Sequence, residues 1–393
     1  MSGLIKLVDQ VDSLASSLAL VTDDIIGVDV ERADSHRYHR TAALVQVGDA
    51  DACVLLDPLA VPDPVALATM CQERTVVLHA LENDLAPMEA LGVRMPKLHD
   101  SAIAAGLLGL PVGLGDLLST VVGVELTTDK SKYQRADWEK RPLSQGMIDY
   151  AAGDVFFLPE LWRALETQLR EADRWEWYEQ ELEATIAGTY VDSRHWEKVK
   201  GSGRLEPEQR SILRSLWDAR ESICREEDIA PNRLIHDKTL LDLALKPAAS
   251  SQELERRDPQ RRRGPIQDHA DELFRAQEIG IDAEPEERAA ARRWSDAQRD
   301  AYDALRDRRS EIAESLGIDA GLLCASRMLH AAISADPMTP DELATAAGLR
   351  PWQREQLLDA LWHAFLDIIE GPETSDDSDG SDDSDGSDGS ADR

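Results

Sequence analysis

The chain has 393 residues, of which 42% are hydrophobic, so it is long enough for two or three globular domains and is not disordered throughout. Its formal net charge of -33 disfavours a polyanion such as nucleic acid, unless local Lys/Arg clusters or metal ions hold it. The 4 cysteines form no CxxC pair, and no apolar run approaches the roughly 18 residues of a membrane span. These features predict a cytoplasmic protein with reduced thiols and no membrane segment.

The first strand that we predict, residues 25–31, is an apolar run that ends in two carboxylates, Asp29 and Glu31. Side chains two positions apart on a strand point to the same face, so the two charges lie side by side at the rim of an apolar sheet. That arrangement is costly unless a cation lies between the carboxylates. The strand therefore predicts a metal site.

Strands and helices alternate after this strand. Residues 42–47 and 53–56 are short apolar runs joined by a Gly-Asp-Ala-Asp turn, which predicts a hairpin. Helices are predicted over residues 64–73 and 84–91, with a buried strand over residues 76–79 between them. This order predicts an α/β domain whose mixed sheet begins with three antiparallel strands.

The rest of the first domain is predicted to be helical, apart from one loop. Two short helices occupy residues 101–122, and a polar, basic loop covers residues 127–141. Residues 143–186 predict one long helical stretch, interrupted near Pro159. We place the end of this domain at residue 187.

Beyond a linker at residues 188–205, the sequence shows only amphipathic helices and their caps. Two blocks, residues 206–284 and 285–370, each begin with a long helix and continue with shorter ones, which predicts a duplicated helical module. Residues 371–393 form a Ser/Asp/Gly tail with nine acidic residues and one arginine. We predict that this tail is disordered, because it has almost no apolar side chain to bury.

Three further residues carry chemistry that fits beside Asp29 and Glu31. Asp84 follows the predicted strand at 76–79, and Tyr150 and Asp154 lie four residues apart on one face of a helix. Taken singly, Asp84 is explained as a helix cap, and the other two as ordinary residues of a helix surface. Their combination and their order along the chain point to a shared site.

The motifs of the Tyr-containing branch of the DEDD 3′-5′ exonucleases are matched, in the same order, by Asp29-x-Glu31, Asp84 and Tyr150-x-x-x-Asp154. Within this branch the chain resembles the ribonuclease D family. The resemblance extends through the loop at residues 129–143, and the two helical blocks resemble paired HRDC domains. It implies a ribonuclease-H-like exonuclease domain over residues 1–187, followed by two all-α HRDC-like domains.

The resemblance also implies the chemistry. Members of the family hydrolyse phosphodiester bonds with two divalent metal ions, Mg²⁺ or Mn²⁺, which prefer oxygen ligands. The implied ligands are Asp29, Glu31, Asp84 and Asp154. Tyr150 is implied to align the attacking water, because a phenol with a pKa near 10 is a poor base at neutral pH. The implied partners are tRNA precursors or other structured RNA.

Basic and aromatic side chains are candidates for binding that RNA. The loop at residues 127–141 and the charged segment after Glu31 offer Lys130, Lys132, Arg135, Trp138, Arg141, Arg37 and Arg40. Packing in the protein interior explains Trp138 equally well.

The histidines have simpler explanations. His36 and His39 have a spacing that could bind metal, but without a further Cys or His ligand they do not predict zinc. His79, at the end of a predicted strand, is expected to be structural or to hydrogen-bond a site residue.

Two alternatives stay open at this stage, and the sequence does not predict the oligomeric state. A DNA exonuclease would carry the same motifs, because they do not report recognition of a 2′-hydroxyl. A non-catalytic RNA-binding scaffold would be expected to lack one of the acids, and all four are present. In the second helical block, acidic residues at helical spacing predict a face unfit for RNA and suited to protein contacts: Asp296, Asp300, Asp303 and Asp307.

Overall fold

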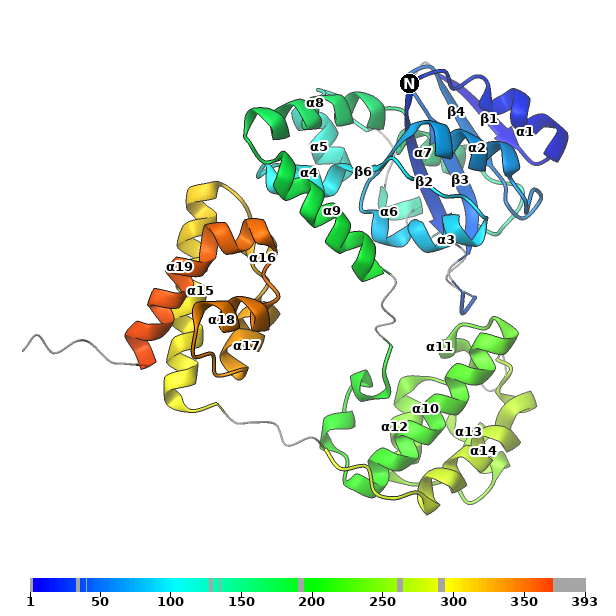
Figure 1. Ribbon diagram of the computed structural model, residues 1–393. Coiled ribbons are helices and arrows are strands. Elements are labelled where there is room, and N and C mark those ends of the chain that lie inside the picture. Colours follow the sequence, from blue (N-terminus) through cyan, green and yellow to red (C-terminus); the bar gives the residue numbers. More distant parts are fainter. Residues whose placement is uncertain are drawn as a thin grey trace, which may run out of the picture. The chain divides into compact units, whose positions relative to one another are not determined.

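A computed structural model describes residues 3–32, 36–39, 41–126, 130–133, 136–189, 194–259, 264–288 and 294–369. The chain, whose helices and strands are labelled in Figure 1, divides into two compact units by its internal contacts. The first contains Met1–Ala291 and Gly317–Leu322, and the second contains Arg292–Leu316 and Leu323–Arg393. Within the first unit, one hydrophobic core surrounds a sheet and another lies among helices.

The described strands of the first unit form a six-stranded mixed sheet in the order β1-β4-β3-β2-β5-β6. Their bounds are Leu4–Val8 (β1), Ile25–Arg32 (β2), Ala42–Gly48 (β3), Ala52–Leu56 (β4), Thr75–Leu78 (β5) and Leu98–Asp100 (β6). The β2-β3 and β3-β4 pairs are antiparallel, which confirms the three successive antiparallel strands predicted from the sequence. The edge strands β1 and β6 were not predicted; both pair in parallel with a neighbour.

Most helices of this sheet domain follow the predicted order, but α1 was not predicted and α6 lies in the segment predicted to be a loop. Their bounds are Val11–Leu18 (α1), Val65–Glu73 (α2), Leu85–Ala90 (α3), Ser101–Leu107 (α4), Leu114–Val121 (α5), Lys130–Tyr133 (α6), Gln145–Gly153 (α7), Leu158–Glu171 (α8) and Trp175–Thr189 (α9), with a 3₁₀ turn at Leu81–Asn83 (η1). The interruption predicted near Pro159 in the helical stretch over residues 143–186 is confirmed between α7 and α8, but a second break, between α8 and α9, was not predicted. Pro159 stands in the first turn of α8, where proline favours a helix start, and the break comes just before it.

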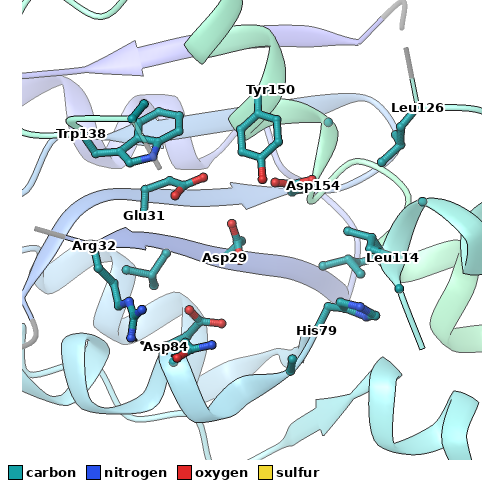
Figure 2. Close-up of a pocket in the computed structure, with 18 of the residues that line it drawn as sticks. Asp29, Glu31, Arg32, His79, Asp84, Leu114, Leu126, Trp138, Tyr150 and Asp154 are labelled. Carbon is teal, nitrogen blue, oxygen red and sulfur yellow. Dashed lines mark hydrogen bonds between the residues drawn. The ribbon is translucent and has the colours of Figure 1, made fainter. Parts of the chain in front are cut away.

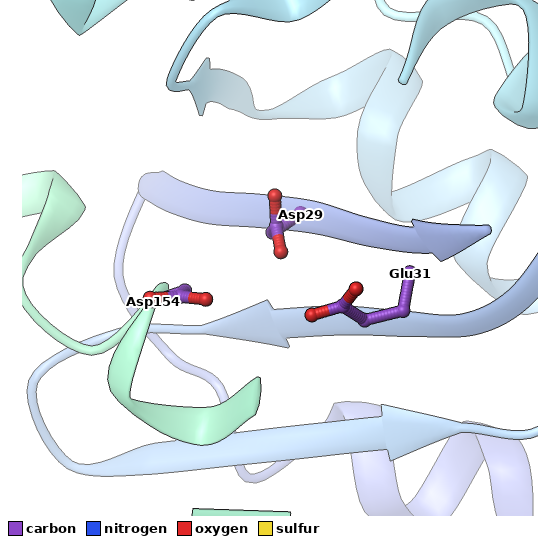
Figure 3. A group of neighbouring side chains, drawn as sticks. All are labelled: Asp29, Glu31 and Asp154. Carbon is purple, nitrogen blue, oxygen red and sulfur yellow. The ribbon is translucent and has the colours of Figure 1, made fainter. Parts of the chain in front are cut away.

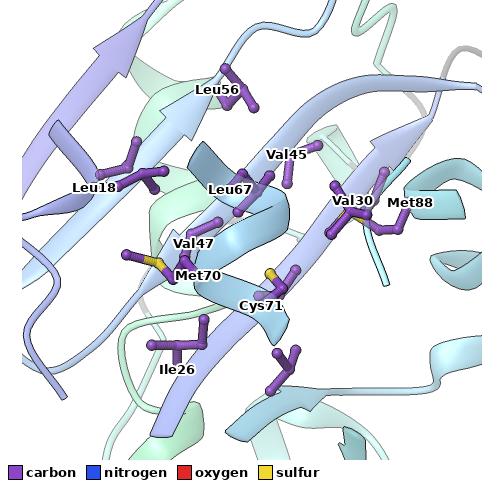
Figure 4. Close-up of a cluster of buried hydrophobic side chains, with 14 of the residues drawn as sticks. Leu18, Ile26, Val30, Val45, Val47, Leu56, Leu67, Met70, Cys71 and Met88 are labelled. Atoms are coloured by element: carbon purple, nitrogen blue, oxygen red, sulfur yellow. The ribbon is translucent and has the colours of Figure 1, made fainter. Parts of the chain in front are cut away.

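Strand β2 separates the hydrophobic core from the opposite face of the sheet. Ile26, Val28 and Val30 point into a core that includes side chains from α1, α2 and α3 (Figure 4). Gly27 and Asp29 alternate with them and face the chain segment where α7 leads into α8. A Cβ atom on Gly27 would lie 2.5 Å from the carbonyl oxygen of Val155 and 2.9 Å from Cβ of Leu158. The absence of a side chain at this position therefore lets that segment pack directly on β2.

The helical part of the first unit contains η2 (Trp196–Lys198), η3 (Ser202–Arg204), α10 (Pro207–Glu227), α11 (Pro231–Leu234), α12 (Asp237–Leu245), α13 (Ser251–Arg257) and α14 (Ile266–Asp282). Its longest helix, α10, buries Ile212, Leu213 and Leu216. Ser250 caps α13 by accepting a hydrogen bond from the backbone N–H of Glu253, as the sequence predicts.

The second unit is also built from helices, namely α15 (Asp296–Leu316), α16 (Ala320–Leu323), α17 (Ser326–Ser334), α18 (Pro340–Ala347) and α19 (Pro351–Ile369). Trp352 and Leu361 of α19 are buried together with Leu305 of α15. Thr339 caps α18 by accepting a hydrogen bond from the backbone N–H of Glu342, and Pro340 occupies the first turn of the helix. Among the described residues, no helix combines the length and the apolar character that a bilayer crossing requires.

We expect Gly27→Ala to destabilise the sheet domain by about 1–3 kcal/mol, because the new methyl group would overlap the backbone of Val155. Thermal unfolding of the purified variant measures this loss. Gly188→Ala is the matched control, since a Cβ atom at Gly188 meets no atom within 4 Å. Equal stability of the two variants would contradict the close approach of α7 and α8 to β2.

Candidate active site

The first two candidate ligands owe their position to strand alternation. Asp29 and Glu31 follow Gly27 on the face of β2 that is turned away from the core, while Val28 and Val30 anchor the strand between them. The ladder with β3 holds Asp29 opposite Gln46 and Glu31 opposite Leu44, and its register shifts after Glu31. The strand thus presents the two carboxylates side by side at the end of its regular pairing.

Asp154 joins them from the other side of the site. It is the C-terminal cap residue of α7, which ends where the chain crosses over Gly27. Asp29, Glu31 and Asp154 each offer a carboxylate oxygen, and these three oxygens lie within 4.8 Å of one another (Figure 3). Three such ligands at this separation can hold a divalent cation.

Asp84 lines the same pocket as this three-acid cluster (Figure 2). It is buried at the junction of η1 and α3. The turn before it is held by Asp100, whose Oδ2 accepts a hydrogen bond of 2.7 Å from the backbone N–H of Leu81. Burial and the nearby charge of Asp29 raise the pKa of Asp84 well above the ordinary aspartate value.

The pKa of Glu31 is raised by causes of the same kind. Burial, followed by the charges of Asp29 and Asp154, raises the pKa of Glu31 well above the ordinary glutamate value, and the nearby Arg32 offsets only part of this. Acids with raised pKa values resist ionising together unless a cation balances them. The donor set therefore fits a centre for divalent cations.

Tyr150 lies one helical turn before Asp154 and points its hydroxyl at that carboxylate (Figure 2). Burial and the charges of Asp154 and Glu31 raise the pKa of this phenol above its ordinary value. The hydroxyl therefore keeps its proton at neutral pH and can act as a hydrogen-bond donor. A protonated phenol is better suited to orienting a water molecule than to removing its proton.

These residues lie in a cavity of about 760 Å³ whose walls combine apolar and polar side chains. Leu114, Leu126 and Trp138 supply apolar surface, and Arg32 supplies a positive charge (Figure 2). Arg32 donates a hydrogen bond of 3.0 Å to Oδ1 of Asn83, which also lines the cavity. The sequence prediction did not include Arg32 among the site residues, although its position directly after Glu31 indicates that it lies close to the acids.

Two further polar residues lie near the acids: His79 lines the cavity, and Gln46 pairs with Asp29 across the sheet. Nδ1 of His79 lies 2.9 Å from Oγ of Ser101, which donates to the carbonyl oxygen of Leu78, so the imidazole is fixed at the cavity wall. Gln46, opposite Asp29, is fully buried, and neither end of its side-chain amide has a hydrogen-bond partner among the described residues. Only knowledge of the register identifies Gln46 as a neighbour of Asp29.

The predicted substrate-binding residues have different surroundings. Trp138 is buried and lines the cavity, so it both packs and faces the site, whereas Lys132 is exposed on α6. Arg141 differs from the prediction: Nε donates to Asp57 and Nη2 donates to the carbonyl oxygen of Ala43, so this guanidinium fastens the loop to the sheet.

Arg37 also engages protein carboxylates, those of Glu139 and Asp228, rather than an open surface. Arg40, Arg135 and the side chain of Lys130 lie outside the described residues.

Comparisons with known proteins agree with this geometry. The family model described as 3′-5′ exonuclease matches residues 5–170, and the HRDC domain model matches residues 209–274 and again 298–365. The two HRDC matches confirm the duplicated helical module, and together with the mixed sheet they confirm the predicted fold class.

Relatives extend the agreement over most of the chain. Ribonuclease D of Pseudomonas paraeruginosa is 30% identical over 359 residues, which cover 87% of this chain and 92% of that protein. Ribonuclease D of a Shewanella species is 28% identical over 318 residues, covering 78% of this chain and 80% of its own. The crystal structure of Escherichia coli RNase D shares the fold, with a TM-score of 0.72 and 23% identity over 93% of this chain and 99% of that one.

The raised pKa of Glu31 predicts how stability depends on pH in metal-free protein. The folded state binds the Glu31 proton more tightly than the unfolded state does, so folding loses stability as the pH rises above the ordinary carboxyl pKa, about 4.3. Glu31→Gln removes this loss. At pH 7 we expect a melting temperature higher by roughly 2–4 °C for each kcal/mol of relieved repulsion, and a gain that fades toward pH 4.

Thermal unfolding in the presence of a chelator measures this gain, and Glu89→Gln on the exposed face of α3 is the matched control. Adding Mg²⁺ or Mn²⁺ should then raise the melting temperature of the unmodified protein far more than that of Glu31→Gln. A Glu31→Gln variant that is less stable than the unmodified protein at pH 7 without metal would contradict the repulsion.

Proposed function

Because the chain belongs to the ribonuclease D family of 3′-5′ exoribonucleases, we propose that it shortens structured RNAs, such as tRNA precursors, from their 3′ ends. The observation that carries this proposal is the cluster of Asp29, Glu31 and Asp154 beside Tyr150 in one cavity. A family that depends on divalent metal needs such a set of oxygen ligands. The non-catalytic alternative has less support, because all four acids and the tyrosine are present and line one cavity.

Two divalent cations, Mg²⁺ or Mn²⁺, are part of the proposal. Asp29, Glu31 and Asp154 would share one cation, and Asp84, across the cavity, would complete the site for the second. When bound, such ions would supply activation of a water molecule and stabilisation of the leaving 3′ oxygen. Asp29 is the best candidate for the bridging ligand, because its charge acts on Glu31, Asp84 and Tyr150 alike.

The protein groups orient the reactants. The Tyr150 hydroxyl, which keeps its proton, hydrogen-bonds the attacking water and aligns it with the phosphorus atom. Leu114, Leu126 and Trp138 offer apolar contact to the terminal bases, while Arg32 lies close enough to the acids to meet a phosphate oxygen. Lys132 on the exposed surface is suited to the phosphate backbone further along the RNA.

The cellular setting belongs to the proposal too. The described cysteines are free, buried thiols, which agrees with a reducing compartment. We therefore assign the enzyme to the cytoplasm, where its RNA substrates would be.

Labelled substrates test the activity directly. We expect 5′-labelled RNA to be shortened progressively from its 3′ end with Mg²⁺ or Mn²⁺, and DNA of the same sequence to be shortened much more slowly. Asp29→Asn should reduce the rate by about 10³-fold, because the loss of a metal ligand removes roughly 4 kcal/mol of charge stabilisation. Equal loss of DNA would instead support the DNA exonuclease, and no metal-dependent loss at all would reject catalysis.

Tyr150→Phe separates alignment of the water from metal binding. It removes the hydroxyl and keeps the ring, so we expect kcat to fall by roughly 10²-fold while the Mn²⁺ affinity stays unchanged. Isothermal titration with Mn²⁺ and single-turnover kinetics measure the two quantities. A parallel loss of metal affinity would show that the hydroxyl supports the ligands rather than the water.

A further inference from the structure

Residues 36–39, the charged segment that follows β2, bind the helical domain of residues 206–284. The Tyr38 side chain is only 8% exposed and belongs to the same hydrophobic core as Leu213 and Ile235. The guanidinium of Arg194 lies 4.0 Å from the centre of the Tyr38 ring. Arg225 donates a hydrogen bond of 3.2 Å to the Tyr38 hydroxyl. An aromatic residue with a satisfied hydroxyl is a typical anchor of one domain in another.

The backbone of this segment is bound at the end of α10. Asp228, in the left-handed conformation with φ of 54°, accepts hydrogen bonds of 3.1 and 2.9 Å from the N–H groups of Tyr38 and His39. The N–H of Ala230 donates to the carbonyl oxygen of His36 at 3.0 Å. Bonds to the main chain fix the path of the segment in a way that contacts of flexible side chains do not.

Arg37 connects this anchor with the exonuclease site. Its Nη1 donates to Asp228 Oδ2 at 2.9 Å, while its Nε and Nη2 donate to Glu139 Oε1 at 2.9 and 2.7 Å. Glu139 directly follows Trp138, which lines the cavity and whose ring centroid lies 6.1 Å from that of Tyr150. One planar guanidinium thus joins the helical domain to the loop that forms a wall of the site.

Two nearby residues of that loop, Glu139 and Arg141, are bound to different parts of the molecule. Arg141 fastens the loop to the sheet through Asp57 and through the carbonyl oxygen of Ala43. Arg37 joins Glu139, two residues before Arg141, to Asp228, which lies 191 positions after Arg37 in the chain. Trp138 directly precedes Glu139, and its carbonyl oxygen accepts a hydrogen bond from Nη1 of Arg141.

We propose that Arg37 is a positioning residue through which the first HRDC-like domain holds the Trp138 loop against the exonuclease site. This inference rests on the proposed function, and it replaces the expectation that Arg37 contacts phosphate. The bridge needs an arginine, because the ammonium of lysine is a point charge that does not reproduce a planar fork bonded to two carboxylates. The helical domain then contributes to turnover even on an RNA that is too short to reach it.

A trinucleotide RNA and a long structured RNA together test the inference on the full-length protein. Arg37→Met should lower kcat on both substrates by roughly tenfold through misplacement of Trp138, without changing the affinity for the long RNA. Glu139→Gln should lower kcat by a similar factor, and the double variant should be no slower than either single one. Arg37→Lys should recover part of the activity.

The controls separate positioning from folding and from RNA binding. Arg214→Met removes an arginine paired with Glu286 in the helical domain and should leave both rates unchanged. Hydrogen exchange of the amides at 136–141 should accelerate in Arg37→Met while the melting temperature stays near that of the unmodified protein.

Two outcomes would overturn the inference. One is unchanged turnover in Arg37→Met. The other is weaker binding of long RNA with a salt slope reduced by about 1 and normal turnover of the trinucleotide, which marks a phosphate contact. An unmodified protein that degrades neither RNA would instead reject the proposed function itself, so the two failures are distinguishable.

Discussion

Repulsion among carboxylates is the constraint around which the exonuclease domain is arranged. Asp29, Glu31 and Asp154 bring three oxygens within 4.8 Å of one another, and burial adds to the cost of ionising them. A flexible segment would relieve such repulsion by moving apart. Strand β2 is held in place, because its alternate residues are packed in the core and the strand is paired on both sides, with β3 and β5. The rigid sheet thus keeps the acids ready for cations.

A second requirement is that a helix end come close to this strand. Gly27 allows it, since any side chain there would meet the carbonyl oxygen of Val155 at 2.5 Å. The same contact sets Asp154 beside Asp29 and, one turn earlier, directs Tyr150 toward the acids. A glycine two residues before the first ligand is therefore as much a part of the site as the ligands, although it has no functional group.

Local patterns in the sequence pointed to the acids that line the cavity and to the central strands, because an apolar run that ends in Asp-x-Glu indicates both a buried strand and two adjacent carboxylates. The edge strands were missed: β1 is partly exposed, and β6 has three residues that become a strand only beside β5. Arg141 looked like a phosphate contact because its loop is basic. Its partner Asp57 lies 84 residues away in the sequence, and such a pairing leaves no local signal.

The acidic composition is compatible with an RNA substrate because of where the charges lie. On α15, Arg299 pairs with Asp296, and Arg306 pairs with Asp303 and Asp307, so much of that face is neutralised within the helix. In the exonuclease site the acids would themselves be the ligands, and bound cations would reverse the sign of the local field. Attraction for the phosphate chain would then be concentrated at the metal centre and Arg32. An acidic protein surface that repels RNA elsewhere favours contact of the RNA 3′ end with the metal centre and Arg32.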